Sequence, residues 1–164
     1  MLPDTSTASS DRDSSADSAE AEEADEENAD DEEVLEAEVD VEDDLRSEIV
    51  TYALQFVGNR YKYGGTNPNT GVDCSGFTSY VMRHAAEVEL PHSSGGQSRM
   101  GRQVSSSEMR PGDIICYGSG KRINHVALYI GNGQIVHAST ERTGIKVSRW
   151  NYRTPVRIVN VLGD

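Results

Sequence analysis

Residues 125–138 read HVALYIGNGQIVHA, and this stretch is the strongest indication of the fold. Two short runs of apolar, largely β-branched residues stand on either side of a central GNG, which is a typical hairpin signal. The stretch therefore predicts two antiparallel strands, at 125–130 and 134–138, with one histidine in each.

The length of the turn decides whether the two histidines share a face of the sheet. A two-residue turn would pair His137 with Leu128 and leave His125 on the opposite face. A three-residue loop, with Gly133 in the left-handed conformation, pairs His137 with Ala127 instead. A glycine at the third loop position favours the second arrangement, which makes His125 and His137 diagonal neighbours roughly 7–8 Å apart.

The sequence around this hairpin predicts an α+β domain. Apolar residues at helical spacing predict a helix over 45–57, which Gly58 ends. Asp73 is a typical N-cap for a second helix that buries Phe77 and its apolar neighbours, with His84 in a structural role. Helices followed by a run of strands indicate an antiparallel sheet. The other predicted strands are 112–117, 145–149 and 156–162, and polar loops are expected at 61–72 and 91–110.

Composition divides the chain near residue 45. Residues 1–45 hold 20 of the 28 Asp and Glu residues and a single basic residue, Arg12. Residues 46–164 hold the other 14 Lys and Arg residues against eight acids. A segment this acidic, with no aromatic residue, cannot bury enough apolar surface to offset the entropy of ordering. We therefore expect residues 1–44 to be a disordered acidic tail or linker and residues 45–164 to form one domain.

The chain shows neither a secretion signal at its start nor an apolar run long enough to cross a membrane. Two cysteines, Cys74 and Cys116, do not make a disulfide framework. Cys116 falls in a predicted strand and is typical of a buried small hydrophobic residue. On these grounds alone the protein is either cytosolic or secreted with its signal removed.

Cys74 stands in DCSGF, residues 73–77, in the first turn of the second predicted helix. The helix dipole favours a thiolate there, and a protonated histidine nearby would lower the thiol pKa from ~8.5 towards ~4–7. We interpret Cys74 as a nucleophile, His125 as the base that takes its proton, and His137 as the group that orients His125. Cys74 alone is equally consistent with a structural role, and either histidine alone fits a half-buried sheet residue better, but the combination predicts a catalytic site.

The same three residue types can also bind zinc. However, the chain contains no CxxC or HExxH pattern and no carboxylate that completes the set. We therefore expect no metal and no cofactor.

Together these motifs resemble those of the NlpC/p60 family of bacterial cell-wall cysteine peptidases. The matching segments are YKYGG (61–65), DCSGF (73–77), RPGDII (110–115), HVALYIG (125–131) and QIVHA (134–138), and the resemblance covers residues 47–162. It implies a papain-like NlpC-type fold, in which the cysteine helix packs on an antiparallel sheet, and a triad of Cys74, His125 and His137.

The resemblance also implies roles for residues around the triad. Tyr61 is expected to contribute a hydroxyl donor to the oxyanion site. Asp73 and Ser75 match positions that line the substrate pocket, and Asp73 can cap its helix at the same time. In LPHSSGGQ, residues 90–97, His92 stands where relatives usually have Arg. We expect His92 to be a weaker, pH-dependent donor to a substrate carboxylate, or else a solvent-facing loop histidine.

The function that the resemblance implies is that of a secreted, cell-wall cysteine endopeptidase. It would cleave peptidoglycan stem peptides between γ-D-glutamate and the diamino acid. Expected partners are these stem peptides and anionic cell-wall polymer, which the basic domain would attract, with no nucleic acid. Two alternatives remain open: a non-catalytic wall-binding module, and an acyl transferase or deamidase with the same triad. The sequence does not identify the diamino acid or the peptide termini that are accepted.

Overall fold

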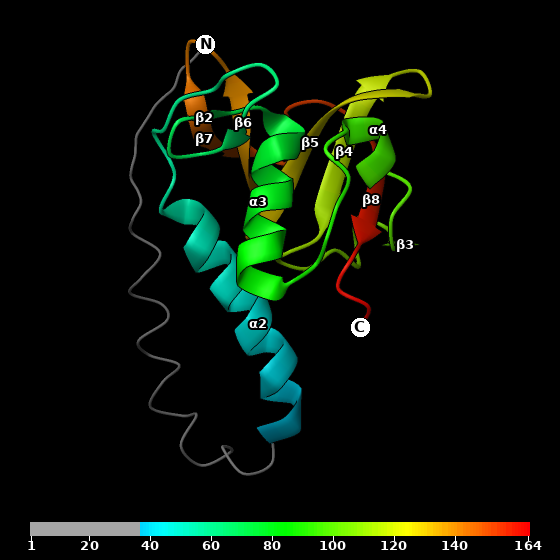
Figure 1. Ribbon diagram of the computed structural model, residues 1–164. Helices are drawn as coiled ribbons and strands as arrows, with labels where there is room; N and C mark the ends of the chain where they lie inside the picture. Colours follow the sequence, from blue (N-terminus) through cyan, green and yellow to red (C-terminus); the bar gives the residue numbers. More distant parts are fainter. Residues whose placement is uncertain (1–36) are drawn as a thin grey trace. The chain divides into compact units, whose positions relative to one another are not determined.

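A six-stranded antiparallel sheet with helices packed on it makes up most of the described protein, residues 37–164 of a computed structural model (Figure 1). The strand order is β3-β8-β4-β5-β6-β7, and a small β1-β2 ladder lies apart from it. The fold is α+β, as the sequence predicts. The expectation of disorder for the first 36 residues lies outside the described residues.

The elements follow one another in the order helix, small ladder, helices, sheet. The helices are α2 (Ala37–Leu54), α3 (Cys74–Ala86) and α4 (Ser94–Gln97). The strands are β1 (Thr66–Asn67), β2 (Gly71–Val72), β3 (Arg102–Gln103), β4 (Ile114–Ser119), β5 (Arg122–Gly131), β6 (Gln134–Thr140), β7 (Gly144–Arg149) and β8 (Pro155–Asn160). No helix in the described part is both long enough and apolar enough to span a membrane.

The β5–β6 hairpin has the register that puts both histidines on one face. Leu128 pairs with Val136, so that His137 stands opposite Ala127. This is the register that the sequence predicts, and it makes His125 and His137 diagonal neighbours.

The turn of this hairpin differs from the expected three-residue loop. Only Asn132 and Gly133 form the turn, both with positive φ (55° and 74°), as a type I′ turn requires. The extra residue lies in a β-bulge before Gly131 instead. A bulge adds one residue to one strand, so a two-residue turn with a bulge gives the same register as a three-residue loop.

Helix α3 lies across the sheet and contacts β5 and β6 (Figure 1). Its fully buried face includes Phe77, Val81 and Met82, which share one core cluster with Leu128 and Val136 of the sheet. Helix α2 adds further apolar residues to that cluster, among them Ile49, Ala53 and Phe56. This core fixes the helix that begins at Cys74 against the strands that carry the histidines.

Several local expectations were wrong in detail. Helix α2 begins at Ala37 rather than residue 45 and ends at Leu54, and the apolar side chains of Leu54 and Val57 are exposed. His84 is also exposed, where it stacks on Tyr80 at 4.0 Å between ring centroids. The two expected loops contain short elements, β1 and β2 in the first and α4 and β3 in the second. Elements of two to four residues were not predicted, because they are too short to show a periodic sequence pattern.

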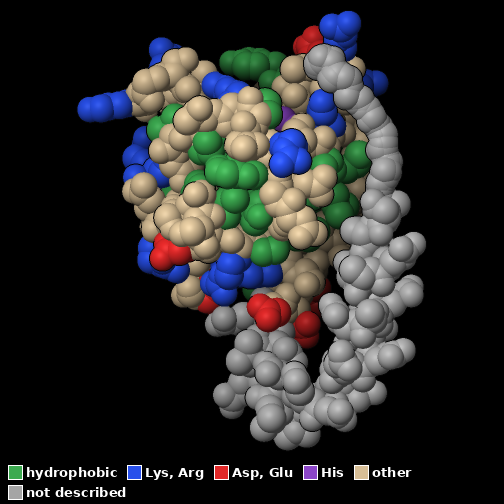
Figure 2. All heavy atoms as spheres, turned by 180° about the vertical axis from the view of Figure 1, so that it is seen from behind, with side chains coloured by type: hydrophobic (Ala, Val, Ile, Leu, Met, Phe, Trp, Pro, Cys, Tyr) green, Lys and Arg blue, Asp and Glu red, His purple; other side chains and the backbone are tan. Residues whose placement is uncertain are grey.

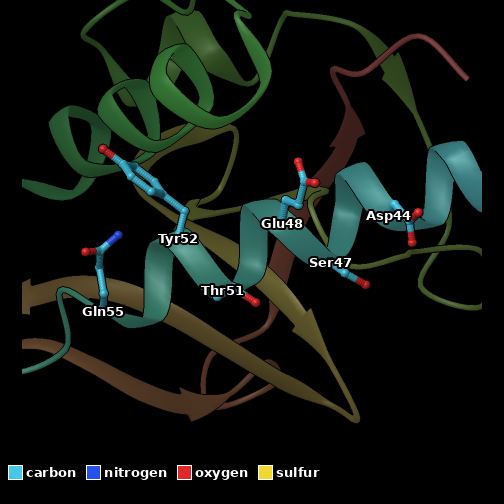
Figure 3. A pocket seen from close by; sticks show the side chains of 6 residues that line it. All are labelled: Asp44, Ser47, Glu48, Thr51, Tyr52 and Gln55. Atoms are coloured by element: carbon cyan, nitrogen blue, oxygen red, sulfur yellow. The ribbon is translucent and has the colours of Figure 1, made fainter. Parts of the chain in front are cut away.

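A hollow lies beside α2 and the residue that follows it, and Figure 3 shows the side chains that line it. Its lining comprises Asp44, Ser47, Glu48, Thr51 and Tyr52 of α2 and Gln55, which follows the helix. Its lining contains no cysteine or histidine, so none of the residues of the predicted triad belongs to it.

A buried arginine connects α2 to the sheet and to the last residue of the chain. Arg46, only 3% exposed, donates to Asp113 Oδ1 (3.1 Å), to the carbonyl oxygen of Pro111 (2.7 Å) and to Asp164 Oδ1 (2.6 Å). Burial raises the pKa of Asp113 despite this partner, whereas hydrogen bonds from Arg46 lower the pKa of the more accessible Asp164 to about 2. The guanidinium thus neutralises a carboxylate that is 1% exposed.

We expect Arg46→Met to destabilise the fold by about 3–5 kcal/mol, because it leaves Asp113 buried without its cation. Urea denaturation measures this change. The double variant Arg46→Met/Asp113→Asn should recover part of the loss, and the exposed Arg99→Met should stay within about 0.5 kcal/mol of the wild type. A loss of similar size in the Arg99 control, or none in the Arg46 variant, would contradict this account.

Candidate active site

The first turn of α3 is held by the carboxylate of Asp73. This residue has an extended backbone (φ −95°, ψ −175°), and its Oδ1 accepts a hydrogen bond from the N–H of Gly76 (2.8 Å). Its Oδ2 accepts from the N–H of Gly64 (3.0 Å). Asp73 is therefore the helix N-cap that the sequence predicts, and Cys74 is the first helical residue, at the positive end of the helix dipole.

Glycines allow the loop before α3 to approach the helix closely. A Cβ on Gly76 would collide with the carbonyl oxygen of Gly65, and a Cβ on Gly65 would collide with that of Gly71. The N–H of Asp73 also donates to the Gly65 carbonyl (3.3 Å). Gly65 and Gly76 are thus required by backbone packing around Cys74.

The two histidines form a buried, hydrogen-bonded pair. His125 Nε2 and His137 Nδ1 are 2.7 Å apart, and the two residues are only 9% and 1% exposed. The other ring nitrogen of His137, Nε2, lies 2.9 Å from Oγ of Ser148 in β7. When Nε2–H of His137 donates to Ser148, Nδ1 of His137 accepts from Nε2–H of His125. Nδ1 of His125 is then unprotonated and free to act as a base.

The thiol of Cys74 lies next to the strand that contains His125. It packs against a buried cluster that includes Cys116 and Val126, and a hydrogen bond from the backbone of Val126 reaches the sulfur. No hydrogen bond joins the thiol to the His125 ring in the structure of residues 37–164. In enzymes without substrate such bonds are often long and shorten only in the reactive complex.

Burial keeps the thiol and both histidines uncharged. It raises the pKa of Cys74, and the hydrogen bond from Val126 opposes this only in part. Burial, together with the nearby charge of Arg153, lowers the pKa of His125 to about 4, and burial also lowers the pKa of His137 well below 6.5. The expected fall in the thiol pKa was therefore wrong, because desolvation penalises both members of a thiolate–imidazolium pair.

Tyr61 lies beside the N-terminus of α3. Its backbone forms an isolated parallel bridge with Val72, one residue before Asp73. Burial raises its pKa, and the neighbouring Cys74 and Asp73 raise it further. The phenol therefore keeps its proton at neutral pH and can donate a hydrogen bond near the thiol.

His92 meets the helix cap directly. Its Nε2 lies 2.9 Å from Oδ1 of Asp73, the same oxygen that caps α3. Its side chain is 36% exposed, so the ring faces both the carboxylate and solvent. Ser75, by contrast, is 5% exposed in the first turn of α3. The three predicted substrate-binding residues, Asp73, Ser75 and His92, are thus gathered around the start of this helix.

Gln97 is a fully buried residue of the site that the sequence did not indicate. Its Nε2 donates to the carbonyl oxygens of Ser75 (2.9 Å) and Pro91 (2.8 Å), and its Oε1 accepts from the hydroxyl of Thr78 (2.6 Å). These bonds tie α4 and the loop before it to α3. The burial of a glutamine in a polar loop cannot be predicted from the local sequence.

Aromatic residues form the side of the site nearest the histidines, and the sequence did not indicate these either. The ring centroid of Tyr117 is 5.9 Å from that of His125, and that of Tyr152 is 5.4 Å from that of His137. The hydroxyl of Tyr117 donates to the carbonyl oxygen of Trp150 (2.6 Å). Tyr117 lies in β4, whereas Trp150 and Tyr152 belong to the segment between β7 and β8, so only the folded chain brings them together.

Comparison with known proteins identifies close similarities. The profile of the NlpC/P60 family matches residues 58–158. The chain is 41% identical over 108 residues to "Murein DD-endopeptidase MepS/Murein LD-carboxypeptidase" of Escherichia coli K12, covering 66% of this chain and 56% of that protein. It is 42% identical over 98 residues to "Probable endopeptidase p60" of Listeria seeligeri, covering 60% of this chain and 18% of that protein. The chain therefore spans little more than half of the first relative and less than a fifth of the second.

Solved structures resemble the fold as well. The NlpC/p60 domain of the peptidoglycan hydrolase SagA superposes with a TM-score of 0.65 at 32% sequence identity, covering 70% of this chain and 97% of that domain. An NlpC/P60 family protein from Bacillus cereus superposes with a TM-score of 0.67 at 27% identity, covering 71% of this chain and 40% of that one.

The buried histidine pair should make stability depend on pH. The pKa of His125 is about 4 in the folded protein, against about 6.5 in the unfolded chain. Between these two pH values the unfolded chain binds the proton more tightly, so the stabilising contribution is complete above pH 6.5 and is lost as the pH falls through 4. We expect His125 alone to remove about 3 kcal/mol between pH 6.5 and 4. Urea unfolding at several pH values measures the slope.

The matched variants for this measurement are His125→Gln and His84→Gln. The first should flatten the pH dependence, and the second, at an exposed histidine, should leave it unchanged. Equal slopes in wild type and His125→Gln would contradict the buried, neutral state of His125.

Proposed function

Because the chain belongs to the NlpC/P60 family, we propose that it is a cysteine endopeptidase that cleaves the stem peptides of peptidoglycan, at the bond between γ-D-glutamate and the diamino acid. The observation that supports this most is the hydrogen-bonded pair of buried histidines, His125 and His137, next to a cysteine at a helix N-terminus. Such a set of nucleophile, base and orienting group suits acyl transfer.

In the first half of the reaction the Cys74 thiol gives its proton to Nδ1 of His125 as the sulfur attacks the scissile carbonyl carbon. The positive charge on His125 and the negative charge on the carbonyl oxygen then appear together, although neither group is charged at rest. Backbone N–H groups at the start of α3 and the hydroxyl of Tyr61 stabilise the oxyanion. His125 next protonates the leaving amine of the diamino acid, and a thioester remains on Cys74.

In the second half water hydrolyses the thioester. His125 accepts a proton from the water, whose oxygen bonds to the acyl carbon, and the thiolate leaves and regains that proton. His137 keeps the His125 ring oriented throughout by the 2.7 Å hydrogen bond. This step distinguishes a hydrolase from an acyl transferase with the same triad, in which an amine or alcohol takes the place of water. A deamidase also consumes one water, but its leaving group is ammonia and the peptide chain stays whole.

The substrate pocket on the acyl side would be formed by Asp73, Ser75 and His92. The cap carboxylate of Asp73 suits a positively charged amine of the stem peptide, and the exposed edge of His92 suits a carboxylate when the ring is protonated. This pairing of opposite charges next to the thiol supports a zwitterionic peptide as the substrate.

A second specificity is favoured by the similarity to the Escherichia coli relative, which is named as a DD-endopeptidase and LD-carboxypeptidase. A DD-endopeptidase would cut the cross-link between two stems rather than the stem itself. Mass spectrometry of the products from one defined cross-linked dimer separates the two, because a cut in the stem and a cut in the cross-link give fragments of different mass.

Action at the cell wall would also use the basic surface of the domain. On the face seen in Figure 2, Lys and Arg side chains lie around a largely hydrophobic centre. We propose that anionic cell-wall polymer contacts these side chains after secretion, an attraction that weakens as salt shortens the screening length.

We expect Cys74→Ala to abolish release of peptides from peptidoglycan, because the thioester forms on the Cys74 sulfur and the other cysteine, Cys116, is fully buried. Cys116→Ala should keep most of the activity, since Cys116 is a buried residue of the sheet. Mass spectrometry of digests, with circular dichroism to check the fold, measures both. Digestion at near wild-type rate by the Cys74 variant would rule out this mechanism.

The histidines and Ser148 should differ in their effects on kcat. His125→Gln should lose nearly all activity, because this ring both takes and returns the proton. His137→Gln can still hydrogen-bond to His125 and should keep part of the rate. Ser148→Ala should lower kcat a few-fold, up to about tenfold, through loss of one hydrogen bond, and Ser148→Thr should restore it. Equal, complete loss in both histidine variants would count against their separate roles.

A further inference from the structure

The segment between β7 and β8 places an arginine beside the catalytic centre. Arg153 is half-buried, and its guanidinium carbon lies 5.6 Å from the centroid of the Tyr117 ring. Its Nη2 donates to Oδ1 of Asn124 (3.1 Å), the residue before His125. The guanidinium is thus anchored against the strand that contains His125, the proposed catalytic base.

The charge of Arg153 is not neutralised by any acidic side chain that the structure describes. The ion pairs of residues 43–164 involve Arg46, Arg110 and His92 as the basic partners. An amide oxygen and a phenol ring stabilise a guanidinium, but they leave its positive charge uncompensated. A guanidinium has five N–H donors, so donors remain for a further partner even with the hydroxyl of Tyr152 close by.

In the proposed mechanism, Arg153 would lie on the leaving-group side of the scissile bond. The group that protonates the leaving amine must lie on that side, and in the proposed mechanism this group is His125. Arg153 is bound to the neighbour of His125 and covers the ring of Tyr117, which itself lies 5.9 Å from the His125 ring. The nearby charge also contributes to the low pKa of His125. The acidic cap Asp73, in contrast, is paired with His92 on the acyl side.

We propose that Arg153 binds a substrate carboxylate on the leaving-group side of the scissile bond, and so favours substrates whose leaving fragment carries that carboxylate. This inference rests on the proposed endopeptidase function. The forked guanidinium matches a carboxylate in a bidentate geometry, which a half-buried site strengthens. Two carboxylates can lie there: the side-chain carboxylate of a diaminopimelate-type residue, which lysine lacks, and the C-terminal carboxylate of a short leaving fragment.

Four synthetic peptides distinguish the two sources. Each is L-alanyl-γ-D-glutamyl-diamino acid, with diaminopimelate or lysine as the third residue and a free or amidated C-terminus. We expect the wild type to prefer peptides with the bound carboxylate by about tenfold or more in kcat/KM. A preference for diaminopimelate identifies the side-chain carboxylate, and a preference for the free C-terminus identifies the terminal one.

The variants are Arg153→Gln and Arg153→Lys, with Arg149→Gln as a control that removes an exposed arginine of β7. Arg153→Gln should lose the preference, with the change mainly in KM, and should still cleave the peptide that lacks the carboxylate at close to the wild-type rate. Cleavage of that peptide also shows that the variant is folded. Arg153→Lys should recover part of the preference, and Arg149→Gln should retain all of it.

An equal loss of kcat/KM on all four peptides in Arg153→Gln, or an unchanged preference in that variant, would overturn the role of Arg153. Cleavage of all four by the wild type with equal efficiency would also overturn it, while the endopeptidase function would stand. Failure of the wild type to cleave any of them would reject the proposed cleavage between γ-D-glutamate and the diamino acid, on which this inference rests.

Discussion

The carboxylate of Asp73 is the constraint on which the candidate site depends. One of its oxygens caps α3 and contacts His92, and the other binds the backbone of the preceding loop at Gly64. A capping carboxylate fixes the residue at which a helix starts. It therefore determines which side chain lies at the positive, N-terminal end of the helix dipole. Because the loop and the helix then approach so closely that only glycine fits at Gly65 and Gly76, the position of Cys74 follows from backbone geometry.

The candidate site keeps its reactive groups neutral at rest and aligned for proton transfer. His125 and His137 are held by each other and by Ser148, inside a sheet that buries them almost completely. Burial makes a positive charge on His125 costly when no negative charge lies nearby. The low-energy route is therefore one in which the charges on the base and on the substrate oxygen develop together. A rigid, desolvated pair of this kind needs little reorganisation during the reaction.

Local patterns in the sequence predicted the α+β fold, the cap at Asp73 and the register that brings His125 and His137 together. The register was right even though its cause, a bulge before Gly131, was not the loop that the glycines suggested. Residues such as Ser148, Gln97 and Arg153 were not predicted, because their partners are distant in sequence and their residue types are common on surfaces. The pKa of Cys74 was predicted in the wrong direction because its burial depends on tertiary packing, which no local motif expresses.

Parts of the two outer edges of the sheet are not paired with another strand. The residues there affect whether two molecules can associate edge to edge. Within the described chain, β3 pairs with β8 only at Val159 and Asn160, and one further bond reaches Ile158. The rest of that edge contains Pro155, which has no N–H to donate, and Arg157. At the other edge β7 presents the exposed Lys146 and Arg149. Proline and like charges at an open edge discourage a second sheet from adding to it, so the fold itself limits edge-to-edge aggregation between neighbouring molecules.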